Sequence, residues 1–452
     1  MPLNQNIKLK LKDGSTVAVV GGGPAGSFFT WFILRYAQES GIKIHVDVFE
    51  PKNFNSTGPA GCNKCGGIVS ESLIQMLSGE GIKVPPKVIR RGIDSYTLHL
   101  EHGKVVIEKP KPEQGIASIF RGLGPRGPID SAQLSFDNFL LDLCREKGAM
   151  VRTDTIVKAL RVEEGIKLST SLSGDKVFDL VVGAVGLNAK GIEIFNSICP
   201  SYFPPSVTKT HIAEIFLGRE VVDQYFGNSM HVFLLNLPNV KFGALIPKGN
   251  YVTMVLLGKN ITREVVAGFL SSETVKSCFP PDTNISEITH CKCYPAINVG
   301  EAKSAFANRV VLIGDSASSK LYKNGLGAAW LTGQAAAKTA IFHGISQRDF
   351  QKWYQPVCTT LDNDNDIGKI IFNITSIMQK SSILKNGLLA MVVQEQKEPS
   401  HKRPMSSLLW DTFTGSNPYT SIFKRSLNPV FMVKFLWNIV KGQLIKKSRI
   451  QK

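Results

Sequence analysis

The chain has 452 residues, more than one ordinary domain usually holds, and 43% of them are hydrophobic and 20% charged, which is typical of a globular protein and too apolar for a disordered one. No run reaches the roughly 18 consecutive apolar residues that a transmembrane helix needs, and the first five residues lack the basic-then-apolar pattern of a signal peptide. The 53 basic and 36 acidic residues give a net charge of +17. We therefore expect a cytoplasmic protein of two or three lobes with an affinity for anionic partners.

The first predicted element is a buried parallel strand at residues 15–20, where β-branched residues run without polar interruption. A glycine-rich turn and an apolar helix at residues 27–34 follow directly, and the turn consists of Gly21, Gly22, Gly23, Pro24, Ala25 and Gly26. Gly21 permits the tight turn, Gly23 lets the backbone approach a pyrophosphate, and Gly26 allows close packing of helix on strand. The exposed N–H groups at the start of the helix would then hold the phosphates.

A second strand at residues 45–50 completes this unit and ends in Glu50. Glu50 lies 24 residues beyond Gly26, where a carboxylate can accept hydrogen bonds from an adenosine ribose. The combination of strand, glycines, helix, strand and acid indicates a dinucleotide site far more strongly than the glycines alone.

The middle of the chain reads as a substrate-binding sheet. Alternating residues at 92–109 predict a hairpin, and three further strands are predicted at 211–217, 230–235 and 251–257. We expect these strands to form an antiparallel sheet that roofs the substrate site, with His211 and His231 in core or surface positions.

A second glycine-rich turn is predicted late in the chain. A buried strand at residues 308–313 ends in Gly314-Asp315, and a helix of small residues opens with Gly325-Leu326-Gly327. An aspartate at a strand end can accept hydrogen bonds from hydroxyl groups, and glycines at a helix start admit a flat ring.

These two turns together resemble those of flavoproteins with the aromatic-hydroxylase fold, and within them the geranylgeranyl reductase family. The resemblance implies FAD as cofactor, with Asp315 on the ribityl chain, Gly325 and Gly327 beside the isoalloxazine, and a Cys-Gly-rich segment over the flavin. It covers about residues 15 to 345 and includes looser matches at 135–141 and 179–186. The residues expected to bind FAD are Gly21, Gly23, Pro24, Ala25, Gly26, Glu50, Cys65, Gly66, Gly67, Gln133, Gly314, Asp315, Gly325, Leu326 and Gly327.

The chain departs from the family pattern in three places. Val185 replaces an aspartate, and Gln133 stands where an arginine usually precedes Phe-Asp, which disfavours a monooxygenase that binds a pyridine nucleotide. The aromatic substrate motif of the family is eroded, and its remnant, the expected substrate-binding set, is Phe242, Ala244, Ile246 and Pro247. The basic loop 121–128, rich in glycine and proline, either contacts the FAD phosphate or a substrate headgroup or is a solvated connector.

Eight cysteines occur at irregular spacing, which does not suggest an extracellular disulfide framework. Two pairs are close in sequence, Cys62 with Cys65 and Cys291 with Cys293. Cys62 and Cys65 are the candidate catalytic residues, as a dithiol relay beside the flavin in which Lys64 lowers a thiol pKa. Alternatively the four thiols hold zinc or an iron–sulfur cluster, or Cys65 is a small residue required near the ring and the others are core thiols. The sequence leaves these three interpretations open, and we assign no metal site.

Residues 346–452 are predicted to be helical. From Lys424 to Lys452 eight basic residues and no acid are interleaved with apolar and aromatic residues, a pattern typical of a helix lying on an anionic membrane surface. The alternative is a helix packed on its own core with solvated lysines. Nucleic acid is not expected, because no zinc-finger spacing or RNP-like motif accompanies the charge. The apolar runs 370–378 and 388–393 are either core or the lining of a lipid entrance.

The sequence therefore predicts an α/β protein with a three-layer, Rossmann-like FAD-binding domain, an inserted antiparallel-sheet substrate domain and a helical C-terminal region. The expected boundaries are 1–75, 110–190 and 300–345 for the first, 76–109 and 191–299 for the second, and 346–452 for the third. The resemblance implies hydride transfer to the carbon–carbon double bonds of a polyprenyl lipid by a peripheral membrane protein. The alternative is electron transfer between a soluble donor and a quinone. The reductant stays open between reduced ferredoxin, NAD(P)H and another protein donor.

Overall fold

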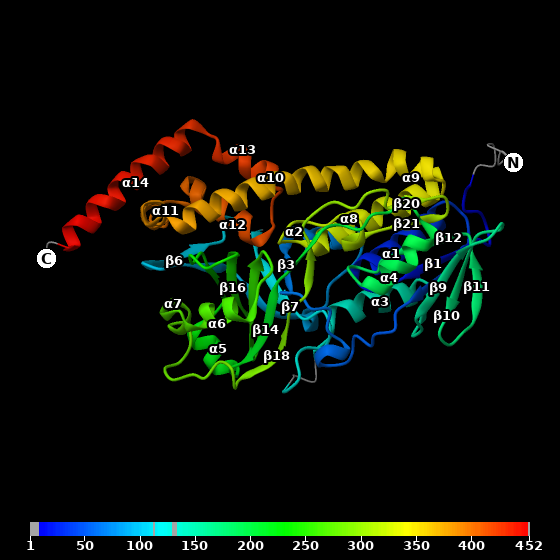
Figure 1. Ribbon diagram of the computed structural model, residues 1–452, viewed down its shortest axis with the longest axis horizontal. Coiled ribbons are helices and arrows are strands. Elements are labelled where there is room, and N and C mark those ends of the chain that lie inside the picture. Colours follow the sequence, from blue (N-terminus) through cyan, green and yellow to red (C-terminus); the bar gives the residue numbers. More distant parts are fainter. Residues whose placement is uncertain (1–8, 112–113, 129–132, 451–452) are drawn as a thin grey trace.

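The structure is a computed structural model that describes residues 9–111, 114–128 and 133–450, with side chains described as far as residue 441. Figure 1 shows an elongated molecule with a large sheet toward each end and a long helix, α10 (Gln355–Lys380), running along one side between them. The start of the chain, in which we found no signal pattern, and the side chains of its last basic residues, Lys446, Lys447, Arg449 and Lys452, lie outside the described residues.

A six-stranded sheet occupies one end, with strand order β20-β21-β12-β1-β2-β8. Its pairs are parallel except at the edge, where β20 is antiparallel to β21. The strands are β1 (Thr16–Val20), β2 (His45–Phe49), β8 (Met150–Arg152), β12 (Leu180–Gly183), β20 (Phe306–Ala307) and β21 (Val310–Leu312).

The strands of this sheet are apolar on both sides, and both faces of the sheet are accordingly covered and shielded from water. Three helices, α1 (Pro24–Glu39), α3 (Phe136–Glu146) and α8 (Gly325–Lys338), pack on one face. The other face carries α4 (Ala189–Ile198) and a small antiparallel sheet of β9 (Ile156–Arg161), β10 (Ile166–Thr170) and β11 (Asp175–Phe178). This arrangement confirms the predicted three-layer α/β fold class.

A seven-stranded sheet, here called the roof sheet, occupies the other end with the order β18-β14-β17-β16-β15-β5-β6. The expectation of a wholly antiparallel sheet is wrong at one pair, because β5 and β15 run parallel. These two strands are far apart in the chain, so no hairpin imposes an antiparallel direction on them. The strands are β5 (Ser95–Leu100), β6 (Gly103–Glu108), β14 (His211–Phe216), β15 (Ser229–Phe233), β16 (Val240–Lys248), β17 (Tyr251–Gly258) and β18 (Thr289–Cys293).

The two faces of the roof sheet are covered by different parts of the chain. Its outer face packs on α5 (Arg219–Tyr225), α6 (Arg263–Ser271) and the region of α7 (Glu273–Lys276). Its inner face, which carries alternate residues such as Phe242, Ala244 and Ile246, packs on helices of the C-terminal region. These helices are α10, α11 (Ser382–Glu395), α12 (Pro404–Thr414) and α13 (Tyr419–Ser426).

A small third sheet corrects one predicted strand. Residues 92–100 do not form one strand, because the chain leaves β4 (Ile89–Ile93) at Asp94 and enters β5 in a different sheet. β4 pairs instead with β7 (Ile116–Ile119), which also pairs with β3 (Ile68–Ser70). The remaining elements are α2 (Glu71–Gly79), α9 (Gln347–Trp353) and the paired strands β13 (Val207–Lys209) and β19 (Ala296–Asn298).

The last helix, α14 (Pro429–Ile450), extends from the end of the molecule and packs on α11 (Figure 1). The two helices approach closely at Gly387, where an added Cβ would lie 2.9 Å from the Cα of Ile439. In the predicted apolar run 388–393, Leu388, Met391 and Val392 are buried. In the run 370–378, Phe372 is buried, whereas Ile370, Ile374 and Ile377 are exposed. Among the described residues, no helix is both long enough and apolar enough to cross a bilayer.

Candidate functional site

The glycine turn after β1 has the close contacts expected of a dinucleotide-binding turn. Gly21 has a positive φ of 106°, and a Cβ there would overlap the carbonyl oxygen of Ala184 on the neighbouring strand. A Cβ on Gly26 would overlap the carbonyl oxygen of Gly21, so α1 begins in direct contact with the turn. Gly23, the N-cap of α1, is different, because its Cβ would meet only Nη2 of Arg121, at 3.4 Å. The turn is therefore closed at Gly21 and Gly26 and has room at Gly23.

Arg121 supplies the cation that faces this turn. Its guanidinium donates to both oxygens of Asp137 at 2.8–3.1 Å, and the Asp137 side chain is fully buried and also bonded to Asn63. Burial opposes the charge of Arg121, but Asp137 and Cys65 outweigh it and raise the pKa of the guanidinium. Arg121 is thus a permanently charged group held in place beside the turn.

A cofactor role was expected for Gln133, and it stays a prediction for this residue. Gln133 lines a surface pocket together with Arg90, Arg91 and Asp223, and no residue of the glycine turn lines that pocket. The charged group beside the glycine turn is Arg121, from the loop at 121–128. Sequence alone pointed to this loop only as one of two alternatives, because nothing local shows which arginine of a Gly-Pro-rich loop turns inward.

Glu50 contacts the turn directly. Its two carboxylate oxygens accept hydrogen bonds from the backbone N–H groups of Gly22 and Lys52, both at 2.9 Å. Burial raises the pKa of Glu50, and these two N–H groups oppose that rise. Each oxygen has a second lone pair, so Glu50 can brace the turn and still accept a ribose hydroxyl.

The second turn lies against the first. Gly314 has a positive φ of 63°, and its Cβ would come within 2.7 Å of the Cβ of Ala25. Asp315 is exposed and accepts a hydrogen bond from Ser319 Oγ at 2.6 Å. Gly325, at the start of α8, lies near Asp315, because a Cβ added to it would be 4.0 Å from Asp315 Oδ1. The structure therefore brings together the first turn, Gly314-Asp315 and the start of α8, where Leu326 and Gly327 follow.

The C-terminal region packs directly on this second turn. Asn324 caps α8 by accepting from the N–H of Gly327 at 3.0 Å, and it donates to the carbonyl oxygen of Gly415 at 3.2 Å. Buried Lys323 donates to the carbonyl oxygen of Asp411 at 2.8 Å, and burial lowers the pKa of Lys323 to about 7. The α12–α13 connection therefore supports the turn, a role that the sequence did not indicate.

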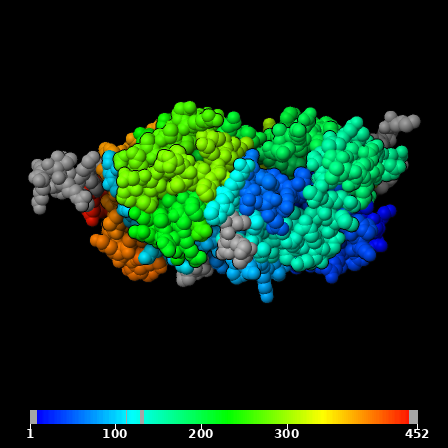
Figure 2. All heavy atoms as spheres, turned by 90° about the horizontal axis from the view of Figure 1, so that it is seen from below, coloured from blue at the N-terminus to red at the C-terminus, as the bar shows by residue number. Residues whose placement is uncertain are grey.

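The segment from Cys62 to Gly67 passes between the two large sheets. A Cβ on Gly67 would come within 2.8 Å of Lys248 Nζ, and one on Gly66 would lie 3.6 Å from Ile246 Cδ1 and 3.3 Å from Val255 Cγ2. In Figure 2 blue atoms from the first part of the chain are visible between the green atoms of the roof-sheet end and the teal atoms of the other end. The segment therefore meets the inner face of the roof sheet at β16 and β17.

Buried Lys248 and Glu214 lie on that inner face. Lys248 is 1% exposed, and its Nζ has no hydrogen-bond partner among the described residues; it lies 3.9 Å from Glu214 Oε1 and 4.8 Å from the ring centroid of Phe120. Glu214 Oε2 accepts from Thr253 Oγ1 at 2.7 Å. Burial raises the pKa of Glu214, and Lys248 opposes the rise. Such an unbonded buried ammonium is costly unless something else contacts it.

The predicted substrate residues are divided between two surroundings. Phe242 packs between Phe372 of α10 and Phe413 of α12, with ring centroids 5.9 and 5.2 Å away. Ile246 instead faces Gly66, and the carbonyl oxygen of Pro247 accepts from Ser118 at 2.7 Å. Ala244 lies between Phe242 and Ile246 on the same face, as strand alternation requires. The same alternation leads to Lys248, two residues after Ile246, and could have identified it from the sequence.

Cys62 and Cys65 do not have the lowered thiol pKa that was expected of a dithiol relay. All eight cysteines are free. Burial raises the pKa of Cys62 and of Cys65, so the expected lowering by Lys64 does not prevail; Lys64 contributes a backbone N–H to Cys62 Sγ at 3.1 Å. Cys291 pairs with Glu214 across neighbouring strands. Within the part of the chain that the structure describes, however, neither cysteine pair belongs to a group of three possible metal ligands whose atoms lie within 4.8 Å of one another. A redox role for Cys62 and Cys65 stays a prediction.

No family model matches the chain, and no curated protein matches it in sequence. Its fold matches solved flavoproteins. A geranylgeranyl bacteriochlorophyll reductase-like protein from Thermoplasma acidophilum has a TM-score of 0.65 and 13% identity, over 95% of this chain and 100% of that one. Halogenase PltM, in a variant complexed with FAD, has a TM-score of 0.60 and 11% identity, over 96% and 92%. The p-nitrophenol 4-monooxygenase PnpA from Pseudomonas putida has a TM-score of 0.57 and 12% identity, over 89% and 100%.

These likenesses establish the fold, which is that of FAD-dependent oxidoreductases, monooxygenases and halogenases. They confirm the fold that the two glycine turns implied. At 11–13% identity they carry no substrate from those proteins to this chain.

Proposed function

We propose that this protein is an FAD-dependent oxidoreductase of the geranylgeranyl reductase type, which reduces carbon–carbon double bonds of a polyprenyl lipid at a membrane surface. The observation that carries the proposal is the meeting of the two glycine turns with the Cys62–Gly67 segment, beneath an apolar strand face that ends in the buried ammonium of Lys248.

FAD fits the residues that are present. Gly23 leaves room for a pyrophosphate beside Arg121, and Glu50 can accept from the adenosine ribose. Asp315 is exposed toward solvent at the second turn and suits the ribityl hydroxyls, while Gly325 offers a backbone surface without a side chain. When bound and reduced, FAD supplies the hydride.

The residues of the roof sheet would position the alkene and provide the proton. Ile246 and Val255 form the apolar surface next to Gly66, which suits an isoprenoid chain. Addition of hydride to one alkene carbon requires a proton at the other, and Lys248 holds protons at Nζ in the same place with no competing hydrogen bond among the described residues. Glu214 Oε1 lies 3.9 Å from Lys248 Nζ, and a proton from solvent would replace the one that Lys248 gives up in each turnover.

The C-terminal helix would bring this site to the membrane. On α14 and just before it, seven large apolar side chains are exposed: Leu427, Val430, Met432, Val433, Leu436, Trp437 and Val440. Lys434 lies among them and Lys441 directly follows Val440, so an apolar surface and positive charge occur on one helix. Both features favour binding to anionic lipid, and each basic residue near the membrane surface contributes about 1 kcal/mol to the binding free energy.

The test uses the FAD-loaded protein, photoreduced without oxygen and mixed with either a geranylgeranyl lipid or a quinone analogue. We expect the lipid to reoxidise the flavin and to gain two hydrogens by mass spectrometry. Reoxidation by the quinone alone would contradict the proposal and favour electron transfer. Lys248→Met should lower the rate with the lipid at least about 100-fold, the usual size of a general-acid contribution, with FAD content retained. Lys292→Met, on the exposed side of the edge strand β18, is the matched control.

A further inference from the structure

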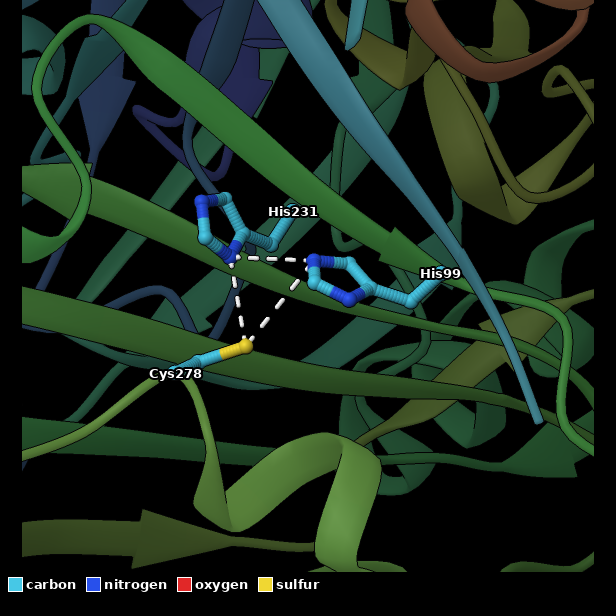
Figure 3. A group of neighbouring side chains, drawn as sticks. All are labelled: His99, His231 and Cys278. Carbon is cyan, nitrogen blue, oxygen red and sulfur yellow. Dashed lines mark hydrogen bonds between the residues drawn. The ribbon is translucent and has the colours of Figure 1, made fainter. Parts of the chain in front are cut away.

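Two histidines and a cysteine meet on the outer face of the roof sheet, away from the face that carries Lys248. His99 lies on β5 and His231 on the adjacent strand β15, and Cys278 follows α7. Figure 3 shows the three side chains pointing toward one another from three separate parts of the chain. All three are buried, with exposed fractions of 1%, 7% and 4%. Sequence alone placed His231 in a core or surface role and gave no reason to join it to the other two.

The three possible ligand atoms form a small triangle. His99 Nε2 is 3.2 Å from His231 Nδ1 and 3.8 Å from Cys278 Sγ, and His231 Nδ1 is 3.4 Å from Cys278 Sγ. Around a tetrahedral zinc ion, bonds of about 2.05 Å to nitrogen and about 2.3 Å to sulfur separate two nitrogens by about 3.3 Å and a nitrogen from a sulfur by about 3.5 Å. A metal ion could therefore reach all three atoms with shifts of only a few tenths of an ångström. In the described part of the chain, no other group of three such atoms is this compact.

The surroundings suit a metal that prefers nitrogen and sulfur. Burial lowers the pKa of His99 to about 3 and of His231 to about 4, so both rings are neutral and each has a lone pair to donate. Burial raises the pKa of the Cys278 thiol to about 11, so a metal ion has to displace the thiol proton in order to bind. The ring of His99 stacks on Phe233 at 4.5 Å, and His231 contacts Phe226 at 4.8 Å. Hard ions such as Mg²⁺ and Ca²⁺ prefer oxygen ligands, which this group does not offer.

We propose that His99 Nε2, His231 Nδ1 and Cys278 Sγ form a zinc site. Binding converts the Cys278 thiol to a zinc-bound thiolate and releases its proton to solvent, so that one S–H bond is replaced by one Zn–S bond with no change of oxidation state. The ion ties β5, β15 and the connection after α7 to one point, and so stabilises the outer side of the roof sheet. The site is independent of the proposed oxidoreductase function, because it lies on the opposite face of the sheet.

The experiment measures zinc in the full-length protein after loading with Zn²⁺ and dialysis against metal-free buffer. We expect about one zinc ion per chain in the wild type, and at least a tenfold lower content in Cys278→Ser and in His231→Phe. The matched control is Cys358→Ser, which alters a buried free cysteine elsewhere and should retain the zinc. The wild type should also show a higher melting temperature with Zn²⁺, whereas Cys278→Ser should show no such shift.

A second readout protects the test against a variant that fails to fold. Co²⁺ added to the wild type should produce a cobalt–thiolate charge-transfer band that is absent from Cys278→Ser, with the circular dichroism of the two proteins matching. A wild type that binds no zinc would overturn the proposal and leave the three side chains as a hydrogen-bonded group. Zinc retained in Cys278→Ser but lost in Cys62→Ser would also overturn it, because the ion would then lie on the other thiols.

Discussion

Replacing Arg121 with methionine tests whether one cation both stabilises the fold and binds the cofactor. Arg121 makes three hydrogen bonds of 2.8–3.1 Å to Asp137, whose side chain is fully buried. Without the guanidinium, a buried carboxylate is left with Asn63 as its remaining side-chain partner. Breaking a buried ion pair in this way costs about 3–5 kcal/mol, so we expect Arg121→Met to lower the free energy of unfolding by that amount. The loss of a charged hydrogen-bond donor next to Gly23 should also weaken FAD binding about 10- to 100-fold.

Urea unfolding and titration of the apoprotein with FAD measure the two effects separately. The double variant Arg121→Met with Asp137→Asn removes both charges, so it should regain most of the stability but none of the FAD affinity. Arg126→Met changes an exposed arginine of the same loop and should alter the free energy of unfolding by less than about 0.5 kcal/mol. If Arg121→Met unfolds within about 1 kcal/mol of the wild type, or the double variant binds FAD normally, the role assigned to Arg121 is refuted.

Three further outcomes are expected. Gly23→Ala should fold normally, since its Cβ would meet a single side-chain nitrogen at 3.4 Å, but should bind FAD at least about 100-fold more weakly because the methyl occupies the pyrophosphate position; unchanged affinity in an FAD titration would contradict this. Burial lowers the pKa of His211 to about 4, below its unfolded value of about 6.5, so the unfolded state takes up the proton first as the pH falls and stability is lost between about pH 6.5 and 4. His211 thus lowers the free energy of unfolding by about 2 kcal/mol at pH 5. The loss of unfolding free energy between pH 8 and pH 5 should therefore be about 2 kcal/mol smaller in His211→Phe than in the wild type. An equal loss in both proteins would exclude His211 as the cause. Val433→Asp with Trp437→Asp should lower binding to phosphatidylserine vesicles about 10-fold or more in a co-sedimentation assay. Leu172→Asp, which alters an exposed leucine on a hairpin outside the C-terminal region, should not lower it, and equal binding by both variants would remove α14 from the proposed membrane contact.

Local patterns in the sequence were sufficient to predict the strands, turns and helix starts that surround the candidate cofactor site. The run of β-branched residues at 16–20, the glycines that follow it and the strand ending at Glu50 are all set by neighbours within a few dozen residues. The same holds for Gly314-Asp315 and the start of α8. Each of these positions is dictated by backbone geometry, because a Cβ at Gly21 or Gly26 would overlap a carbonyl oxygen.

Local pattern was misleading where the relevant contact is distant in sequence. The resemblance pointed to Gln133, whereas the arginine that the folded chain brings to the turn is Arg121, from a loop that the sequence left open between two roles. Lys64 was expected to lower the pKa of a neighbouring thiol, but burial raises the pKa of Cys62 by more than the backbone N–H of Lys64 lowers it.

The chemistry within the site was decided by tertiary structure. Lys248 and Glu214 face each other because β14, β17 and β16 lie side by side, so these two side chains come within 3.9 Å only once the strands pair. His99, His231 and Cys278 meet across separations of 132 and 179 residues, and the parallel pairing of β5 with β15 that aligns the two histidines follows from no local rule. A sequence specifies turns and strands through contacts between near neighbours, whereas the joining of distant side chains depends on which strands the whole core selects as partners.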